Sequence, residues 1–433
     1  MIVKRCVIRS PLIIAILCAT MLLLSGCHRG KDRVIIHWLW WPVTPEWDKA
    51  LADLIEEFER THPGVVIKPD KVGWQGYQSK VLTLGAAGMC PDIIMSCVEA
   101  GFYSLYLERG LIMDLTPFIG SDPDYNLSDF FPCGLDAFRE NGKLYGIPVD
   151  MNPCIMYYNK KIFDEAGEPY PDGTWDTTKL LQVARKLTKD TNGDGRIDQC
   201  GFAYDSYLYW LLRAGIDLTD ANHTRVTFNT PKAADVLQFL VDLRLKYGVT
   251  PSLSFQQMGN SYELFSTGRI AMFEGIPAYC SHLLRNKRLD WDIAPVVQLG
   301  KKPVVNLPIT GYSISSQTKH PREAWQFVRF ITSPAAYRYM RIKTGNIPPR
   351  RSVCEDPKVF GPPPGNIKLI VDILKYAQST PHFTRLPELM DVANRGFDKM
   401  TLGQQSVRRG LAIIEKEGNE ILSRPSRMEA PRG

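Results

Sequence analysis

The chain has 433 residues, of which 44% are hydrophobic and 23% charged, with 33 Gly and 31 Pro. That composition excludes a fibrous or intrinsically disordered protein, and the length predicts two to three globular domains. The net charge of +6 falls to +3 without Lys4, Arg5 and Arg9. Because the remaining basic residues are scattered among 46 acids, no electrostatic footprint for nucleic acid stands out, and none is expected as a partner.

The N-terminus has the order of an export signal: basic residues, an apolar run over 11–24, then small residues. The run is shorter than the roughly 20 residues that a membrane-spanning helix needs. Its ending, Leu24-Ser25-Gly26-Cys27, resembles the lipobox of bacterial lipoproteins, which predicts cleavage before Cys27 and a lipid on its sulfur. The alternative is an ordinary signal peptide with an incidental cysteine. Both interpretations export the protein, and the first tethers it to the bacterial cell membrane.

Seven cysteines follow Cys27, an odd number, so at least one thiol must stay free within a single chain. Disulfides are compatible with an exported protein, and Cys90 and Cys97 are the closest pair in the sequence. Burial of most of these thiols in the core is an equally good interpretation.

The first hundred residues alternate between strand and helix patterns. Residues 28–33 form a short polar linker, and a continuous apolar run over 34–41 predicts a buried parallel strand. Helical spacing over 46–60 and 77–84 separates further strands at 65–68 and 91–96. Three more helices are predicted at 177–189, 231–247 and 321–330, and a Pro/Gly-rich loop at 360–366. This alternation predicts an α/β fold.

Four stretches together resemble the extracellular solute-binding proteins of ATP-binding cassette (ABC) sugar importers, the group of maltose- and glycerol-phosphate-binding proteins. They are KLYGIPVD from Lys143 with IMYYNKKIFDEAG from Ile155, GTWD from Gly173, FSTGRIAM from Phe265 with WDIAP from Trp291, and KHPREAWQFVRFITSP from Lys319. Their order and spacing extend the resemblance over about residues 33 to 425.

The resemblance implies a two-lobed periplasmic-binding-protein fold of type II, with the ligand cleft between the lobes and three interdomain crossings. These crossings are expected near 149–152, 310–314 and 341–346. The N-terminal lobe would then comprise 34–150 plus 311–345, the C-terminal lobe 151–310 plus 346–425, and residues 426–433 a flexible tail. It further implies a monomer that binds a small carbohydrate, hands it to the transmembrane subunits of an ABC permease, and requires no cofactor.

Sugars present apolar ring faces and a belt of hydroxyls, so their sites combine aromatic platforms with carboxylates and amides. Such side chains are expected where strands end or the chain crosses between lobes. In the first half of the chain this selects Trp40, Trp41, Glu99, Asp150 and Asn152. In the second half it selects Tyr204, Asp205, Trp210, Gly275, Tyr279, Gly311, Tyr312 and Arg385. Trp210 is also a natural core residue, and Tyr279 stands where the family usually has a tryptophan that stacks on sugar.

The segment from Asp190 to Asp198 resembles the first part of a calcium-binding loop. Asp190, Asn192, Asp194 and Asp198 take oxygen-bearing positions, and Gly195 takes the sharp-turn position. Gly201 replaces the bidentate glutamate at position twelve. Two interpretations stay open: a structural calcium site, or an Asp/Gly-rich turn that binds no metal.

No catalytic motif is present for an acyl-transfer serine, a zinc helix or a phosphate-binding loop. The strongest enzyme hypothesis is a glycoside hydrolase that uses two acids such as Asp150 and Asp205, although no motif pairs them. A non-enzymatic binding protein is therefore expected. The alternatives are a binding protein for glycerol phosphate or another polyol, which calls for Arg or Lys in the cleft, and a surface lipoprotein without a transport role.

Overall fold

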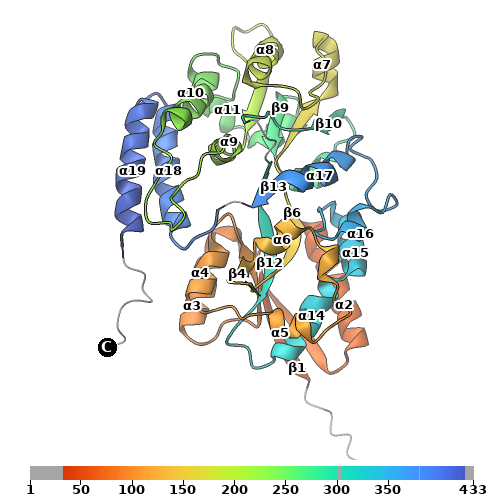
Figure 1. The fold of residues 1–433 in the computed structure, drawn as a ribbon. Coiled ribbons are helices and arrows are strands. Elements are labelled where there is room, and N and C mark those ends of the chain that lie inside the picture. The colour runs from red at the N-terminus through yellow and green to blue at the C-terminus, as the bar shows by residue number, and fades with distance from the viewer. Residues whose placement is uncertain (1–32, 301–304, 380, 425–433) are drawn as a thin grey trace, which may run out of the picture.

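The computed structural model describes residues 33–300, 305–379 and 381–424. Two α/β lobes are stacked one above the other, with the first strand in the lower lobe of Figure 1 and the two C-terminal helices in the upper one. The predicted signal with Cys27, most of the linker and the tail at 426–433 lie outside the described residues. Within the described part, no helix has both the length and the apolarity to cross a membrane.

The first lobe contains a five-stranded sheet in the order β2-β1-β3-β12-β6. Its strands are β1 Val34–Trp40, β2 Val65–Lys71, β3 Ile93–Cys97, β6 Ile147–Met151 and β12 Ile309–Ile314. β1 runs parallel to β2 and β3, whereas β12 runs antiparallel to β3 and β6. The helices are α2 Pro45–Thr61, α3 Trp74–Ala86, α4 Phe102–Glu108, α5 Thr116–Gly120, η1 Leu127–Asp129, α6 Pro132–Asp136, α14 Pro321–Ile331, α15 Pro334–Thr344 and α16 Arg351–Cys354, with the hairpin β4 Arg139–Glu140 and β5 Lys143–Leu144.

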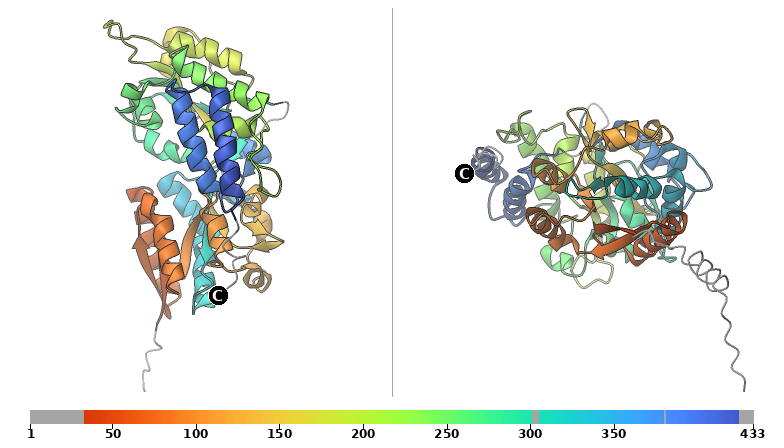
Figure 2. Two further views of the ribbon diagram at one scale, coloured as in Figure 1. Left: turned by 90° about the vertical axis from the view of Figure 1, so that its left-hand side faces the viewer. Right: turned by 90° about the horizontal axis from the view of Figure 1, so that it is seen from below.

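The second lobe contains a four-stranded sheet in the order β10-β7-β9-β8. Its strands are β7 Ile155–Asn159, β8 Cys200–Tyr204, β9 Ile270–Gly275 and β10 Trp291–Ala294. Helices cover it: α7 Lys160–Ala166, α8 Thr177–Leu187, α9 Tyr207–Arg213, α10 Pro231–Leu245, α11 Leu253–Gln256, α12 Ser261–Ser266, η2 Pro277–Tyr279, α13 Cys280–Leu283, α17 Lys368–Ile373, η3 Leu374–Tyr376, α18 Leu386–Thr401 and α19 Val407–Leu422. α18 and α19 stand side by side on one flank of this lobe (Figure 2).

Local sequence explains the longer helices. Thr44 caps α2 by accepting a hydrogen bond from the Trp47 backbone N–H at 3.1 Å, and Pro45 takes the first turn, where its missing N–H costs nothing. Thr230 and Pro231 begin α10 in the same way. The predicted helices and the early strands are confirmed to within three residues at each end.

Buried side chains form two clusters. One fills the first lobe and continues onto one face of the second sheet, with Tyr157 and Phe273 stacked at 4.6 Å. The other fills the opposite face, where Met156 and Met272 lie among the helices of the second lobe. Adjacent strand residues thus serve opposite faces, as the two-residue period of a strand requires.

All seven cysteines in the described part are free thiols, and only Cys133 is not fully buried. The interpretation of these cysteines as core thiols therefore describes the structure, whereas the conceivable Cys90–Cys97 bridge is not formed.

The chain crosses between the lobes close to the first two expected places. It leaves the first sheet after Met151 and enters the second at Ile155. It returns between β11 Val305–Leu307 and β12, so Thr310 already belongs to the first sheet. β11 pairs with β13 Ala377–Ser379 in a small parallel sheet, which contacts α9 on one side and α6 on the other.

The third crossing lies later than the expected 341–346. Arg350 is 2% exposed and donates to the carbonyls of Thr332 and Asn126 in the first lobe, at 2.9 and 3.0 Å. The chain then contacts the second lobe at Asn366, whose backbone N–H donates to Asp292. The carbonyls of Ile347 and Pro349 also accept from the backbone N–H groups of Met151 and Phe131 in the first lobe, both at 2.9 Å. Residues 346–354 therefore belong to the first lobe, where the buried guanidinium of Arg350 finds its acceptors.

Candidate functional site

Two carboxylates come together at one edge of the first sheet. Cys97, Thr310 and Asp150 lie in one row across β3, β12 and β6. Glu99 follows Cys97 just past the end of β3. Residues in one row of a sheet point to the same face, and this edge holds the carboxyl ends of β1, β2 and β3. Glu99 and Asp150, both selected from the sequence, therefore lie at the same edge of the first sheet.

Loss of hydration dominates the electrostatics of both acids. It raises the pKa of Glu99 to about 7, partly offset by backbone N–H groups and the Cys97 thiol, while the neighbouring charge of Asp150 adds to the rise. It raises the pKa of Asp150 to about 6, offset by hydrogen bonds from the Asn152 side chain and the Thr310 backbone. Glu99 Oε2 and Asp150 Oδ1 are buried and have no hydrogen-bond partner among the described residues. Two acceptors are therefore available for donors that the described chain does not supply.

The second lobe contributes a third acid beside two aromatic rings. Asp205 follows β8 and accepts a hydrogen bond from the Tyr279 hydroxyl. The Tyr279 ring stacks on Tyr262 at 5.0 Å. Asp205 is exposed, yet desolvation raises its pKa to about 7. The Asp205 side chain is thus accessible to solvent while neighbouring atoms displace part of its hydration.

Tyr209 of α9 links the two groups of acids. Its pKa is raised first by burial and then by the charges of Glu99 from the first lobe and of Cys154 and Asp205 from the second. Tyr209 thus lies within electrostatic reach of Glu99 from the first lobe and Asp205 from the second. Asp150 and Asn152 adjoin Glu99 at the first crossing, and Tyr279 adjoins Asp205. We call these six residues the interlobe cluster.

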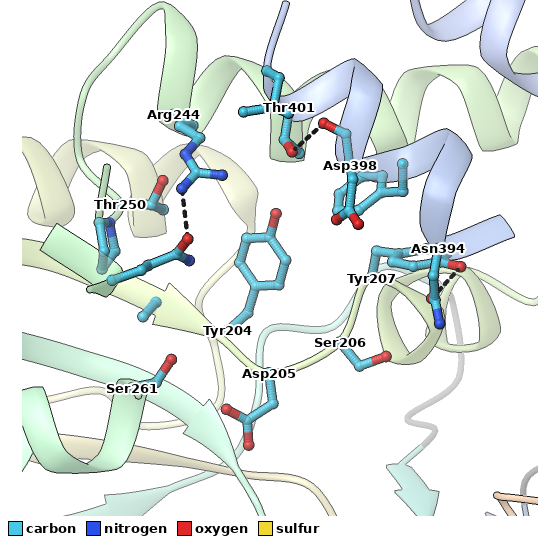
Figure 3. Close-up of a pocket in the computed structure, with 15 residues that line it drawn as sticks. Tyr204, Asp205, Ser206, Tyr207, Arg244, Thr250, Ser261, Asn394, Asp398 and Thr401 are labelled. Atoms are coloured by element: carbon cyan, nitrogen blue, oxygen red, sulfur yellow. Dashed lines mark hydrogen bonds between the residues drawn. The ribbon is translucent and has the colours of Figure 1, made fainter. Parts of the chain in front are cut away.

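A cavity of about 630 Å³ lies within the second lobe, and of the interlobe cluster only Asp205 lines it. Tyr204 points into it while Asp205, the next residue, points the opposite way (Figure 3). Two hydrogen bonds order its wall: Tyr207 to Asn394 at 3.0 Å and Arg244 to Gln256 at 2.8 Å. Its volume lies within the range of small-molecule sites.

Aromatic side chains gather at the same edge of the first lobe. Trp41 is buried and meets Trp74 edge to face at 5.0 Å, and Trp74 stacks on Phe102 at 4.9 Å. Trp74 follows the end of β2 and is 46% exposed, which gives it a free ring face. An exposed indole of this kind suits the apolar face of a sugar ring.

Several residues that the sequence selected have packing roles instead. Trp40 is 2% exposed and packs edge to face against Trp38 at 4.2 Å, and Tyr312 packs against the same Trp38 at 5.4 Å. Trp210 is buried in the second lobe, where the Arg213 guanidinium lies 4.7 Å from its ring. These three rings belong to cores, which corrects the expectation that they face ligand.

The two selected glycines allow close packing, and Arg385 lies away from the acids. A Cβ on Gly311 would come within 2.4 Å of the Phe138 ring, and one on Gly275 within 2.7 Å of Phe273 and 2.9 Å of Tyr279. Arg385 donates to Glu388 and to the Arg424 carbonyl, both at 3.2 Å. It lines a separate groove between α3, α4 and α18.

Sequence reasoning did not select Trp74, Tyr209 or Tyr262. Trp74 carries the same signal as Trp41, an aromatic residue just past a strand, and a consistent use of that rule would have found it. Tyr209 lies within the selected segment 204–210 but was passed over in favour of Trp210. Tyr262 stands on α12, and nothing in the sequence places that helix beside Tyr279.

In the loop that resembles a calcium site, the side-chain oxygens accept hydrogen bonds from the loop's own backbone N–H groups. Asp190 accepts from the N–H groups of Gly193 and Gly195, both at 2.7 Å, and Asp198 accepts from the Thr191 N–H at 2.8 Å. Asn192 and Asp194 accept from the backbone two residues on. Within the described ranges, no three His, Cys, Asp or Glu side chains converge in a way that could hold a metal ion.

Comparison with known proteins identifies the family. The family model for bacterial extracellular solute-binding proteins matches residues 41–338. The chain is 24% identical to the multiple sugar-binding protein of Streptococcus mutans over 73% of this chain and 77% of that protein. It is 25% identical to the putative ABC transporter periplasmic-binding protein YcjN of Escherichia coli, of which it covers 55%, just over half.

Solved structures show the same two-lobed fold. The ABC substrate-binding protein Lmo0181 of Listeria monocytogenes, in complex with cycloalternan, superposes with a TM-score of 0.82 at 22% identity, over 91% of this chain and all of that one. MalE3 of T. maritima with bound maltose gives a TM-score of 0.76 at 22% identity, over 90% of this chain. With the family model spanning most of the described residues and the predicted fold confirmed, this chain belongs to the bacterial extracellular solute-binding protein family.

Proposed function

We propose that this protein captures a carbohydrate between its lobes and delivers it to an ABC permease. The observation that carries the proposal is the interlobe cluster, in which carboxylates come from both lobes and two tyrosines from the second. Two of its carboxylate oxygens, in Glu99 and Asp150, have no hydrogen-bond partner among the described residues. Sugar hydroxyls are donors that such acceptors bind, and the exposed Trp74 adds an apolar surface at the same edge. The named relatives, among them multiple sugar-, maltotriose- and arabinooligosaccharide-binding proteins, support this ligand class.

Binding without catalysis is the form of the proposal that the site favours. A glycoside hydrolase needs two carboxyl groups on either side of the scissile bond, at a separation that fits the reaction. Here Asp150 and Asp205 belong to different lobes and are both held by hydrogen bonds, from Asn152 and Tyr279 respectively. Closure of two lobes around a ligand is the established mechanism by which such a fold couples binding to recognition by a partner.

Cys27, the candidate lipid attachment site, supports a further part of the proposal. A lipid on this residue would hold an exported monomer at the membrane surface, near the permease. Cys27→Ala is expected to abolish the incorporation of labelled palmitate that the wild-type protein shows in the native bacterium. Label that persists in the Cys27→Ala protein would contradict lipid attachment at this residue and leave the binding proposal unaffected.

The ligand class is tested by thermal unfolding of the chain from His28 with mono-, di- and oligosaccharides, polyols and glycerol phosphates. A ligand at a hundred times its dissociation constant adds about 2.7 kcal/mol to the free energy of unfolding, so the melting temperature of the protein rises. Asp150→Ala is expected to remove this rise, and Glu56→Gln, on the exposed face of α2, to retain it. Release of reducing ends from the bound saccharide would instead establish a hydrolase.

A further inference from the structure

The cavity within the second lobe contains hydrogen-bond donors from three elements. Tyr204 ends β8, Arg244 stands in the last turn of α10, and Gln256 ends α11. Arg244 Nη2 donates to Gln256 Oε1 at 2.8 Å, so the amide NH2 group of Gln256 remains available as a donor. Burial raises the pKa of Tyr204 and the Arg244 guanidinium lowers it, which places the phenol within reach of this charge. We call these three side chains the donor group.

Arg244 has an amide and no acid as its partner, although two acids line the same cavity. Among the residues that the structure describes, its side chain forms no ion pair. In the view of Figure 3, Asp398 of α18 lies across the Tyr204 hydroxyl from Arg244, and Asp205 points the opposite way from Tyr204. The guanidinium thus has N–H groups that no carboxylate of the described chain occupies.

The other side of the cavity offers acceptors and an apolar surface. Asp398 is exposed, and its carboxylate has no hydrogen-bond partner within the described ranges. The rings of Tyr207 and Phe397, which also line the cavity, stack at 4.3 Å. Carboxylate oxygens accept hydrogen bonds from hydroxyl groups, and aromatic rings pack on the apolar face of a sugar. This side therefore suits a polyhydroxylated ring, whereas the donor group suits an anion.

Every residue that lines this cavity belongs to the second lobe. The lining comes from β8, α9, α10, α11, α12 and α18 and from the loops that join them. Asp205 alone is shared with the interlobe cluster. The shape of the cavity is therefore set within one lobe, and binding there does not require the two lobes to close.

From these observations we propose that the cavity is a second ligand site, separate from the interlobe cleft, and that it binds a sugar acid. The donor group holds the carboxylate of the ligand, because hydrogen bonds between a guanidinium and a carboxylate are stronger than those between neutral groups. Asp398 accepts hydrogen bonds from the ring hydroxyls. A singly charged carboxylate suits the cavity better than a doubly charged phosphate, because Asp205 and Asp398 line it as well. This inference goes beyond the proposed capture of a carbohydrate in the cleft.

The site is tested by calorimetric titration of the chain from His28 with glucose, galactose and mannose, their uronates and their phosphates. At least one uronate is expected to bind the wild-type protein, and Arg244→Gln to weaken that binding by about tenfold or more. Tyr204→Phe, which removes only the hydroxyl, is expected to weaken it as well. Lys246→Gln is the matched control, because it removes the same charge from an exposed residue that does not line the cavity. Silence of every uronate, or an equal loss in Arg244→Gln and Lys246→Gln, would overturn the proposal.

A crossed comparison separates this site from the cleft. Asp150→Ala is expected to abolish the binding of a neutral saccharide and to leave uronate binding unchanged, and Arg244→Gln to do the reverse. Loss of both ligands in Asp150→Ala would place the uronate in the cleft, which overturns the second site and leaves the carbohydrate function intact. A hexose phosphate or inorganic phosphate that binds as tightly as the uronate would overturn the carboxylate assignment. Uronate binding in a protein that binds no neutral saccharide would instead support this site and contradict the proposed function of the cleft.

Discussion

Glu99 is a residue whose ionisation opposes folding, and this makes the stability of the ligand-free protein depend on pH. Desolvation raises its pKa from an ordinary 4.5 to about 7, with Cys97, Asp150 and Tyr209 as the titratable groups around it. As pH rises, the unfolded chain therefore loses this proton first. The contribution of Glu99 to the free energy of unfolding should fall between about pH 4.5 and about pH 7, and stay constant above.

The measurement is urea unfolding of the ligand-free protein at a series of pH values. Glu99→Gln should be more stable than the wild type near pH 8 and should gain nothing near pH 4, so the two curves converge in acid. Glu56→Gln should run parallel to the wild type. If the free energies of unfolding of Glu99→Gln and wild type stay parallel across this pH range, the Glu99 carboxylate remains hydrated in the folded protein.

The sequence identified site residues at the ends of strands more reliably than residues within buried runs. Glu99, Asp150 and Asp205 stand at the ends of strands or at a crossing, where a polar side chain after a buried run has few structural roles. Trp40 is the last residue of β1 and Tyr312 stands inside β12, and the residues on either side of each ring are buried. Where successive residues are all buried, no alternation shows which face a ring takes, so a core ring and a ligand-facing ring have the same pattern.

At the scale of elements, α8 and β8 approach each other so closely that only glycine fits between them. A Cβ on Gly201 of β8 would lie 2.0 Å from the Ala184 carbonyl oxygen, a backbone atom that cannot move alone. Gly201 also stands at the twelfth position of the calcium-like loop, so a bidentate glutamate has no room there.

Gly201→Ala should therefore destabilise the protein by about 3 kcal/mol or more. Gly64→Ala is the matched control, because a Cβ there meets no atom within 4 Å. Thermal unfolding of both variants checks this, and a Gly201→Ala protein that melts with the wild type would show that α8 can move away from β8.

The sequence predicts long elements well and short ones poorly. α10 has its own N-cap in Thr230, and both α10 and α14 have a proline in the first turn and helical periodicity, so local pattern suffices. β11 and β13 have three residues each and pair across about seventy positions of the sequence. Strands this short exist only because tertiary contacts align them, and single-sequence periodicity cannot show such contacts.

At the scale of the whole molecule, an ion pair connects the two lobes at the rim of the cleft. Glu46 lies in the first turn of α2 and Arg285 follows α13 in the other lobe. Both side chains are about half exposed, so solvent screens the pair and keeps its contribution small.

If this pair favours the closed arrangement, Arg285→Glu should weaken ligand binding by up to about fivefold and the double variant Glu46→Arg with Arg285→Glu should restore it. Titrations at low and high salt provide the check, because salt should erase the difference between wild type and the single variant. An equal loss of affinity in the single and double variants would show that the pair has no part in closure.

The position of β12 also determines the order in which the lobes can be completed during synthesis. β12 lies between β3 and β6, yet it follows every strand of the second sheet in the chain. When a ribosome has made residues 34 to 294, the second lobe has its full sheet while the first still lacks a central strand. The lobe that begins the chain is thus the last to close its sheet, the reverse of the usual order in which N-terminal domains fold first. The first sheet therefore stays incomplete until β12 has been made.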